Sequence, residues 1–422
     1  MRTQLLKFTC LLTFAASPAL ADEWPPVEAR LLQPREGLGN VLAKLERGER
    51  VRVAYFGGSI TAANGWRPMT MKWFREKYPK AQVEEIHAAI GGTPSLLGAF
   101  RNRRDVLDKE PDLVFVEFSV NDGWIRPPLL HQTMEGIVRQ TWIADPWCDI
   151  CFVYTFRVGY EKELRERRCP RAPSGHERVA AHYGIPGINV ALRVVELEEE
   201  GKLVFKLPRG EKDAEGRIVF SNDGVHPTKA GHEVYTDVIG ESMTVLAEMA
   251  RPGPHFLVRP FDEGNYEDAK LVDLEPSMFH GSWKKMDVTR GLGKRFHNRL
   301  PVIWHGGAPG DAVSFKFKGT TCKVYDLLGP DGGRIKITLD GKEQRPRDRF
   351  DHYCTYHRLA DMGIADNVPD TVHTVRLEIM KEQPDRESVL SRVRDKPNFN
   401  PKKYDGTNMW VGYIMLRGEL VD

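Results

Sequence analysis

The segment Val51-Arg52-Val53-Ala54-Tyr55-Phe56-Gly57-Gly58-Ser59-Ile60-Thr61 decides the fold of the N-terminal half of the chain. Its first six residues are mostly apolar and have the length of a buried β-strand. The two glycines that follow allow a tight turn and a close approach of the backbone. Ser59 comes directly after this turn, where it is either an ordinary helix cap or a reactive side chain at a strand end. The segment therefore predicts a strand, a turn and a serine whose role depends on its partners.

The same alternation of strand and helix extends over about residues 50–250. Short apolar runs predict strands at 51–56, 83–90, 112–118, 150–155 and around 185–189. Amphipathic stretches between them predict helices at 66–77, 94–107, 129–143, 174–183, 190–200 and 228–249. Because strands and helices alternate, we expect a parallel sheet covered by helices on both faces, which is a three-layer α/β/α domain.

The pattern changes after a linker at residues 251–265, which contains Pro252, Pro254 and Pro260. Residues 266–422 have short alternating runs rich in β-branched and aromatic residues, at 313–318, 322–327, 334–339, 371–380 and 409–418. Turn sequences such as Asp340-Gly341 separate these runs. We therefore expect a second domain that is a β-sandwich, with a long charged surface loop at residues 382–405.

The N-terminus has the pattern of a secretory signal peptide. Arg2 and Lys7 give a basic start, residues 8–20 are mostly apolar, and Ala19-Leu20-Ala21 is a small-x-small cleavage site. The apolar run is short for a membrane-spanning helix, which favours a cleaved signal over an uncleaved anchor. We therefore expect cleavage after Ala21 and a secreted or periplasmic protein, in which residues 22–49 lead into the first domain. No later segment is long and apolar enough to span a membrane.

The composition is that of a soluble globular protein. Of 422 residues, 28% are charged and 41% hydrophobic, and the formal net charge is +2. This length is sufficient for two domains. The small net charge argues against nucleic acid or an anionic membrane as the main partner, and the oligomeric state is left undefined.

Six cysteines are present, and five remain once the predicted cleavage removes Cys10. An odd number leaves at least one thiol outside any intramolecular disulfide. The spacing Cys148-x-x-Cys151 occurs in redox and zinc motifs, but no second Cys or His pair stands at a zinc-site spacing. We therefore expect buried structural cysteines or a local disulfide here, and neither a metal nor another cofactor.

An acid and a histidine stand together in Ser221-Asn222-Asp223-Gly224-Val225-His226-Pro227. An acid three residues before a histidine can lie on the same side of one turn and reach the imidazole. It then fixes the tautomer and stabilises the imidazolium that forms when the ring accepts a serine proton. Because a serine hydroxyl is a poor nucleophile until a base removes this proton, Ser59 with this pair predicts an acyl-transfer enzyme. A metal site made of Asp223, His226 and His232 is the alternative.

Two further expected strands end in groups that can stabilise an oxyanion. The glycines of Ile90-Gly91-Gly92-Thr93 follow the second strand and present unhindered backbone N–H groups. Asn121 follows the third strand, in Ser119-Val120-Asn121-Asp122-Gly123, and its side-chain amide can donate to the same oxygen. Taken alone, the glycine pair is a common turn and the asparagine is typical of an Asx turn.

In their order along the chain, these four blocks resemble the SGNH hydrolases, also called GDSL hydrolases, over about residues 50–250. In that family the serine is the nucleophile, and its own N–H, a glycine N–H and an asparagine amide form the oxyanion hole. The resemblance implies a catalytic triad of Ser59, His226 and Asp223. It also implies an oxyanion hole formed by Ser59, Gly92 and Asn121.

Four details bear on the resemblance. Gly57-Gly58-Ser59 replaces the usual Gly-Asp-Ser, and Ser119 replaces the glycine of the usual Gly-x-Asn-Asp. Neither change removes a group that makes or breaks bonds, but both point away from the lipase-like members. Gly91 is an alternative to Gly92 as the donor. Thr61 stands where the nucleophile elbow of an α/β-hydrolase has its last glycine, which argues against that fold.

With its predicted export and its second β domain, the chain resembles the carbohydrate esterases of this superfamily, which often carry a jelly-roll domain. The resemblance implies removal of O-acetyl groups from a plant or algal polysaccharide or oligosaccharide, through an acyl-enzyme and without a cofactor. Trp66 and Trp124 flank the serine and asparagine blocks and either stack on sugar rings or pack internally. The alternatives are acyl transfer to a sugar hydroxyl, carbohydrate binding with a silent hydrolase domain, and lipase or thioesterase activity.

Overall fold

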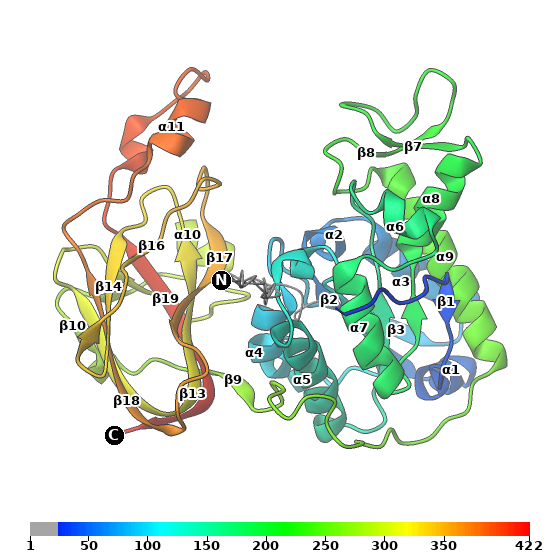
Figure 1. Ribbon diagram of the computed structural model, residues 1–422, viewed down its shortest axis with the longest axis horizontal. Coiled ribbons are helices and arrows are strands. Elements are labelled where there is room, and N and C mark those ends of the chain that lie inside the picture. Colours follow the sequence, from blue (N-terminus) through cyan, green and yellow to red (C-terminus); the bar gives the residue numbers. More distant parts are fainter. Residues whose placement is uncertain (1–23) are drawn as a thin grey trace, which may run out of the picture.

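The computed structural model describes residues 24–422, so the predicted signal peptide lies outside the described residues. An α/β lobe and a β lobe lie side by side (Figure 1). The α/β lobe contains a six-stranded sheet of order β1-β6-β5-β4-β2-β3. Its strands are β1 (Leu32–Gln33), β2 (Arg50–Gly57), β3 (Gln82–His87), β4 (Leu113–Glu117), β5 (Asp149–Val153) and β6 (Gly187–Ile188). Neighbouring strands pair in parallel, except that β1 runs antiparallel to β6.

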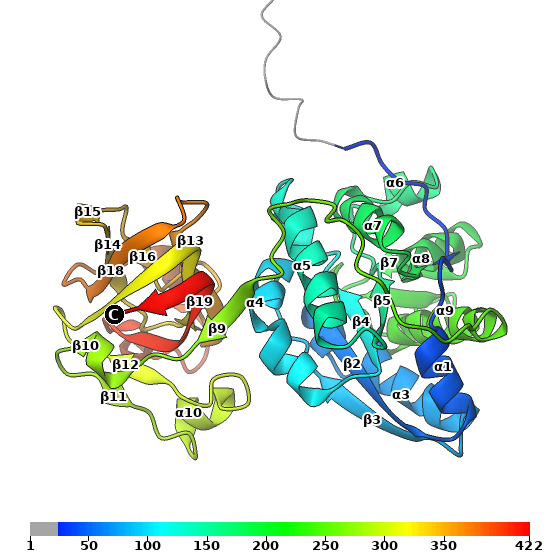
Figure 2. The same cartoon turned by 90° about the horizontal axis from the view of Figure 1, so that it is seen from below.

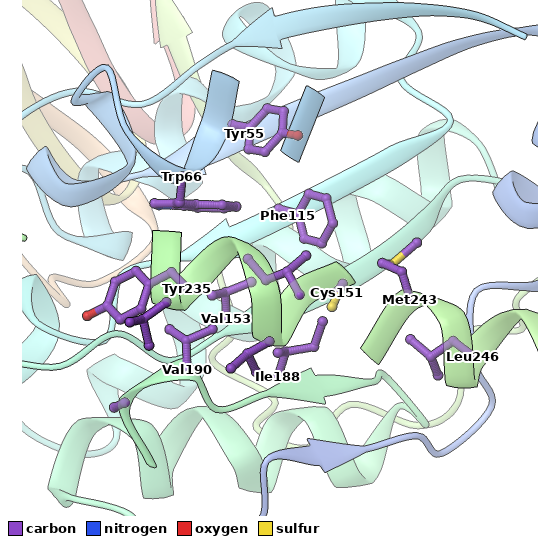
Figure 3. Packing of buried hydrophobic residues seen from close by; sticks show 14 of the residues in the cluster. Tyr55, Trp66, Phe115, Cys151, Val153, Ile188, Val190, Tyr235, Met243 and Leu246 are labelled. Atoms are coloured by element: carbon purple, nitrogen blue, oxygen red, sulfur yellow. The ribbon is translucent and has the colours of Figure 1, made fainter. Parts of the chain in front are cut away.

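Helices cover both faces of this sheet. One layer contains α1 (Gly39–Glu46), α3 (Trp66–Lys77), α8 (Val190–Glu199) and α9 (Lys229–Glu248), and the other contains α4 (Ser95–Asp105), α5 (Leu129–Ala144) and α7 (Arg171–His182). Successive side chains of a strand point to opposite faces, so Tyr55 and Phe115 pack in the first layer and Phe56 in the second. Figure 3 shows Tyr55 and Phe115 above Tyr235 and Met243 of α9. Burial on both faces explains why the central strands β2, β4 and β5 are mostly apolar, whereas the edge strand β3 carries Glu84 and Glu85.

The expected three-layer α/β/α class is confirmed. The helix predicted at 66–77 has these bounds, and the other predicted elements of this lobe are present within a few residues. Residues 22–49, expected only to lead into the domain, contribute β1 and α1 to the α/β lobe. The short elements α6 (Glu161–Arg165), β7 (Leu203–Lys206) and β8 (Ile218–Ser221) were not predicted, because so few residues reveal no hydrophobic period.

The β lobe is an antiparallel β-sandwich, as expected, and it lies against α4 and α5 (Figures 1 and 2). Its strands are β9 (Ala269–Val272), β10 (Phe279–His280), β11 (Lys284–Lys285), β12 (Trp304–Gly306), β13 (Ala312–Leu328), β14 (Arg334–Leu339), β15 (Lys342–Glu343), β16 (Arg347–Asp348), β17 (Arg358–Ala365), β18 (Thr371–Ile379) and β19 (Met409–Val421). The long strands β13 and β19 pair with each other, and β13 also pairs with β18 and then with β17. One apolar core lies within the β lobe. A second core joins side chains of the β lobe to the α4 and α5 side of the α/β lobe.

Two predictions for the β lobe were wrong in detail. The runs at 313–318 and 322–327 belong to one strand, β13, whose pairing register shifts at Gly319, where φ is +154°. The segment 382–405 is not a plain surface loop, because it contains the helix α11 (Glu387–Val393). Val389 of this helix is buried in a small cluster with Phe350 and Tyr404, which holds the otherwise polar segment in place.

The five cysteines among residues 24–422 are free and buried. Cys148 packs in the layer of α4 and α5, whereas Cys151 packs on the opposite face of the sheet. The structure therefore favours buried thiols over a local disulfide. Within the described part of the chain, no helix is both long and apolar enough to cross a membrane.

Candidate active site

Side chains from several loops meet at the carboxyl ends of β2, β3 and β4. Ser59 begins the short helix α2 (Ser59–Ala62) directly after β2, and Asn121 begins the 3-10 turn η3 (Asn121–Trp124) after β4. β2 and β4 are neighbours in the sheet although β3 lies between them in sequence, so the strand order reverses here. Such a switch point leaves a crevice outside the strand ends, where active sites of open α/β sheets lie.

The loop between β8 and α9 brings an acid and a base to this crevice. His226 Nε2 lies 2.8 Å from Ser59 Oγ, and His226 Nδ1 lies 2.7 Å from Asp223 Oδ2. An ionised carboxylate can only accept hydrogen bonds, so its pairing with Asp223 places the ring hydrogen of His226 on Nδ1. Nε2 is then free to accept a hydrogen bond from the serine hydroxyl. The three residues form one hydrogen-bonded chain from hydroxyl to carboxylate, an arrangement that can activate a serine.

Asp223 is held in position by the backbone of its own loop. Its Oδ1 accepts hydrogen bonds from the N–H groups of Val225 and His226, each at 2.8 Å. Partial burial acts to raise the pKa of Asp223, but the hydrogen bonds from the His226 ring and from both N–H groups outweigh it and hold the pKa well below its usual value. The carboxylate is therefore ionised at every pH at which such an enzyme works.

Three glycines lie in the turns around Ser59. A Cβ atom at Gly58 would lie 1.9 Å from Asn121 Oδ1, so only glycine leaves room for this amide beside the nucleophile turn. A Cβ atom at Gly91 would lie 3.6 Å from Ser59 Cβ, which places the loop after β3 against the serine. Gly92 has a φ of +74°, a conformation that favours glycine. Both loop glycines stay candidates for the backbone donor.

Residues 55–234 match the model of the GDSL-like Lipase/Acylhydrolase family. The matched residues all lie in the α/β lobe, which is called the GDSL-like lobe below. The GDSL-like lobe is therefore that of a carboxylic ester hydrolase, and its match begins within β2 and ends within α9. No curated protein matches the chain.

The two lobes together match two solved structures of the same esterase. These are a two-domain esterase (CEX) active on acetylated mannans, and the same esterase co-crystallized with mannopentaose. Each is 20% identical to this chain, and each match covers 92% of this chain and 97% of that chain with a TM-score of 0.71. At this identity, the likeness shows that the GDSL-like lobe and the β-sandwich share the two-domain fold.

The two tryptophans proposed to contact substrate lie in different environments. Trp124 is 84% exposed on η3, three residues after Asn121. Trp66 is fully buried, edge-on to Tyr55 with ring centroids 5.2 Å apart and to Phe115 at 5.9 Å (Figure 3). The prediction that Trp66 stacks on sugar is therefore wrong, because its indole fills the core beneath α3.

The sequence reasoning missed a buried carboxyl group beneath the nucleophile turn of the GDSL-like lobe. Glu117 ends β4 and is 1% exposed. Its carboxyl group accepts hydrogen bonds from Thr61 Oγ1 at 2.7 Å and from Thr155 Oγ1 at 2.8 Å. Burial raises the pKa of Glu117 to about 7, against the opposing effect of these hydrogen bonds. A single glutamate in the apolar run of residues 113–118 was the available signal.

A second buried acid secures the loop that carries Asn121. Asp122 Oδ1 accepts from the N–H of Ser95 at 2.8 Å, and its Oδ2 lies 2.8 Å from His176 Nε2. Asp122 and His176 are both buried. The contact ties η3 to the start of α4 and to α7, so Asn121 stands on a braced loop.

His232 does not form a metal site with Asp223 and His226, the alternative considered from the sequence. Its Nδ1 accepts a hydrogen bond from the N–H of Trp66 at 3.2 Å. Burial first, and then the charge of His226, lower the pKa of His232 to about 4. Among residues 24–422, no group of three or more His, Cys, Asp or Glu side chains is arranged to hold a metal ion.

Proposed function

We propose that this protein is an exported serine esterase that removes O-acetyl groups from a polysaccharide or oligosaccharide. The observation that carries the proposal is the hydrogen-bonded chain Ser59–His226–Asp223 at the switch point of the sheet. The two-domain fold shared with an esterase active on acetylated mannans supports the carbohydrate substrate and makes acetylated mannan the first one to test.

In the proposed first step, His226 Nε2 accepts the proton of Ser59 Oγ as this oxygen attacks the acetyl carbonyl carbon. The carbonyl oxygen becomes an oxyanion, which accepts hydrogen bonds from the N–H of Ser59, the N–H of Gly92 and the amide of Asn121. His226 then donates its proton to the sugar oxygen, which leaves as an alcohol while the acetyl group stays on Ser59.

In the second step, a water molecule takes the place of the sugar hydroxyl. His226 accepts a proton from this water, which attacks the acetyl-serine carbonyl. The same donors stabilise the second oxyanion, and His226 returns the proton to Ser59 Oγ as acetate leaves. Asp223 stays ionised throughout and stabilises the imidazolium that forms twice in each cycle.

The openness of the site suits a polymeric substrate and hydrolysis. The side chains of His226 and Asp223 are 48% and 57% exposed, so water and a bulky glycan both reach the triad. A small acetyl group needs no deep acyl cavity. Trp124, exposed beside Asn121, offers an indole face on which a sugar ring next to the acetylated one can stack.

Export is part of the proposal and rests on the sequence of residues 1–21, with cleavage after Ala21. It places the enzyme outside the cytoplasm, where polysaccharides are found. Mass spectrometry of the N-terminus of the exported protein tests the cleavage position directly.

The proposal is tested by acetate release from acetylated mannan, acetylated xylan, acetylated pectin and a sugar-free aryl acetate. Residues 22–422 are compared with Ser59→Ala, and with Ser391→Ala on α11 as an exposed serine outside the site. We expect release that Ser59→Ala abolishes and Ser391→Ala preserves. Absence of release from every substrate contradicts the esterase assignment, and acetyl transfer to added sugar in place of free acetate identifies an acyltransferase.

A further inference from the structure

The segment of residues 87–90 leads from β3 into the two glycines of the site, and both β2 and nearby side chains hold its backbone. Two of its N–H groups bond to β2: Ala88 N–H donates to Tyr55 O and Ile90 N–H donates to Gly57 O, each at 3.0 Å. Each of its four carbonyl groups accepts a hydrogen bond from a side chain. The last of them, Ile90 O, accepts from Thr93 Oγ1 at 2.8 Å.

Two arginines hold the other three carbonyl groups. Arg299 Nη2 donates to His87 O at 2.8 Å and to Ala89 O at 3.3 Å. Arg101 Nη1, from α4, donates to the carbonyl between them, Ala88 O, at 2.5 Å. Guanidinium groups suit this task, because their N–H donors have a fixed planar geometry.

Arg299 belongs to the β lobe and not to the GDSL-like lobe. It follows the short helix α10 (Gly291–Phe296), and its own N–H donates to Phe296 O at 2.9 Å. Leu300 and Ile303, next along the chain, are fully buried in the apolar core that joins the two lobes. Arg104 of α4 donates to Arg299 O, and its guanidinium lies over the Tyr413 ring of β19 at 4.9 Å. The backbone around Arg299 is therefore fixed from both sides.

Asp105 at the end of α4 fixes the two guanidinium groups relative to each other. Its Oδ2 lies 3.0 Å from Arg101 Nη1 and 3.6 Å from Arg299 Nη1. The side chains of Arg101 and Asp105 are 0% and 4% exposed, and that of Arg299 is 16% exposed. Charge–charge contacts shielded from water are strong, so this cluster orients Arg299 toward the segment.

We propose that Arg299 is a positioning residue, through which the β-sandwich domain holds the Gly91-Gly92 donors in register with Ser59. The inference rests on the proposed esterase function. Loss of the guanidinium would leave His87 O and Ala89 O without their donor, and the segment would shift where it enters the glycine turn. A displacement of about 1 Å at a catalytic group reduces turnover by roughly 100-fold. The second domain then contributes to the chemical step itself, in addition to any contact with substrate.

The test compares Arg299→Ala and Arg299→Lys with the wild type on a sugar-free aryl acetate, which removes any contribution from glycan binding. Arg290→Ala is the matched control, because Arg290 lies just before the same helix and its side chain is 84% exposed. For Arg299→Ala we expect kcat to fall roughly 10- to 100-fold, with KM changed less than about 3-fold. Arg299→Lys should recover part of kcat, because an ammonium group supplies one of the lost bonds. Arg290→Ala should behave as the wild type.

Hydrogen exchange gives a second readout that does not depend on turnover. In Arg299→Ala, amides of residues 87–93 should exchange faster, while those of residues 218–228, which carry His226, should be unchanged. A folded Arg299→Ala protein with wild-type kcat and wild-type exchange over residues 87–93 overturns the inference. So does a uniform loss of protection across both lobes, which indicates general destabilisation. An inactive wild type would instead refute the proposed function, and the exchange result would still decide the role of Arg299.

Discussion

A methyl group at position 58 should disable the oxyanion hole without touching the triad. The φ of Gly58 is −90°, outside the left-handed region that favours glycine, so the main effect of Gly58→Ala is the contact made by its Cβ atom. Its Cβ would lie 1.9 Å from Asn121 Oδ1 and 2.8 Å from Asn121 Cγ, far inside van der Waals contact. Because the loop of Asn121 is braced through Asp122, the amide has to rotate away from the position beside Ser59.

The expected magnitude is that of one lost oxyanion donor. Removal of such a donor typically raises the barrier by about 3–4 kcal/mol, which lowers kcat roughly 100- to 1000-fold. Steady-state kinetics with an aryl acetate measure this loss, and KM should change little. A double-mutant cycle isolates the cause: on an Asn121→Ala background, Gly58→Ala should add less than about 0.5 kcal/mol, because the group that it displaces is already gone.

The matched control is Gly123→Ala, on the same turn as Asn121. A Cβ atom at Gly123 meets only Tyr160 Oη, at 3.9 Å, which is an ordinary contact. We expect this variant to keep wild-type kcat. The reasoning is refuted if Gly58→Ala retains wild-type kcat, or if it costs as much on the Asn121→Ala background as it does alone.

Three further predictions concern the carboxyl groups and the exposed indole. Asp223→Asn should lower kcat by about 10,000-fold, because the amide favours the wrong imidazole tautomer; unchanged pH–rate profiles and kcat would contradict this role. The pKa of Glu117 lies above its unfolded value, so Glu117 weakens folding as pH rises from about 4.5 to about 7, by up to about 3 kcal/mol. The Tm of Glu117→Gln relative to wild type should therefore be higher at pH 8 than at pH 5, and a constant difference would show that Glu117 titrates normally. Trp124→Ala should reduce kcat/KM on acetylated mannan while leaving the aryl acetate rate and the Tm unchanged, and equal losses on both substrates would exclude sugar stacking.

The α/β lobe could be predicted well from the sequence, because the strand and helix patterns of its segments agree with the way these segments pack in the fold. Strands such as Val51–Phe56 are mostly apolar, and the serine, glycine and asparagine blocks each follow a strand whose end can be located. The bounds of α3 were predicted correctly, but the direction of Trp66 was not. A tryptophan at the first turn of a helix faces either the crevice or the core, and the packing of Tyr55 and Phe115 decides between them.

What could not be predicted depends on contacts between distant segments. Arg299 reaches the carbonyl groups of His87 and Ala89 across more than 200 residues of sequence, and nothing in its neighbourhood marks it. The strand β17 reads Arg-Leu-Ala-Asp-Met-Gly-Ile-Ala and has little β-branched character, so only its pairing with β13 makes it a strand. Val389 lies in a charged segment, and its burial follows from the cluster around Phe350.

The most direct test of the account is covalent labelling of the nucleophile. A fluorophosphonate reacts with an activated serine, and peptide mass spectrometry locates the modified residue. The account predicts stoichiometric labelling of Ser59, loss of acetate release in proportion to the label, and little labelling in His226→Ala. Label on another residue, or acetate release that persists after Ser59 is fully labelled, would contradict it.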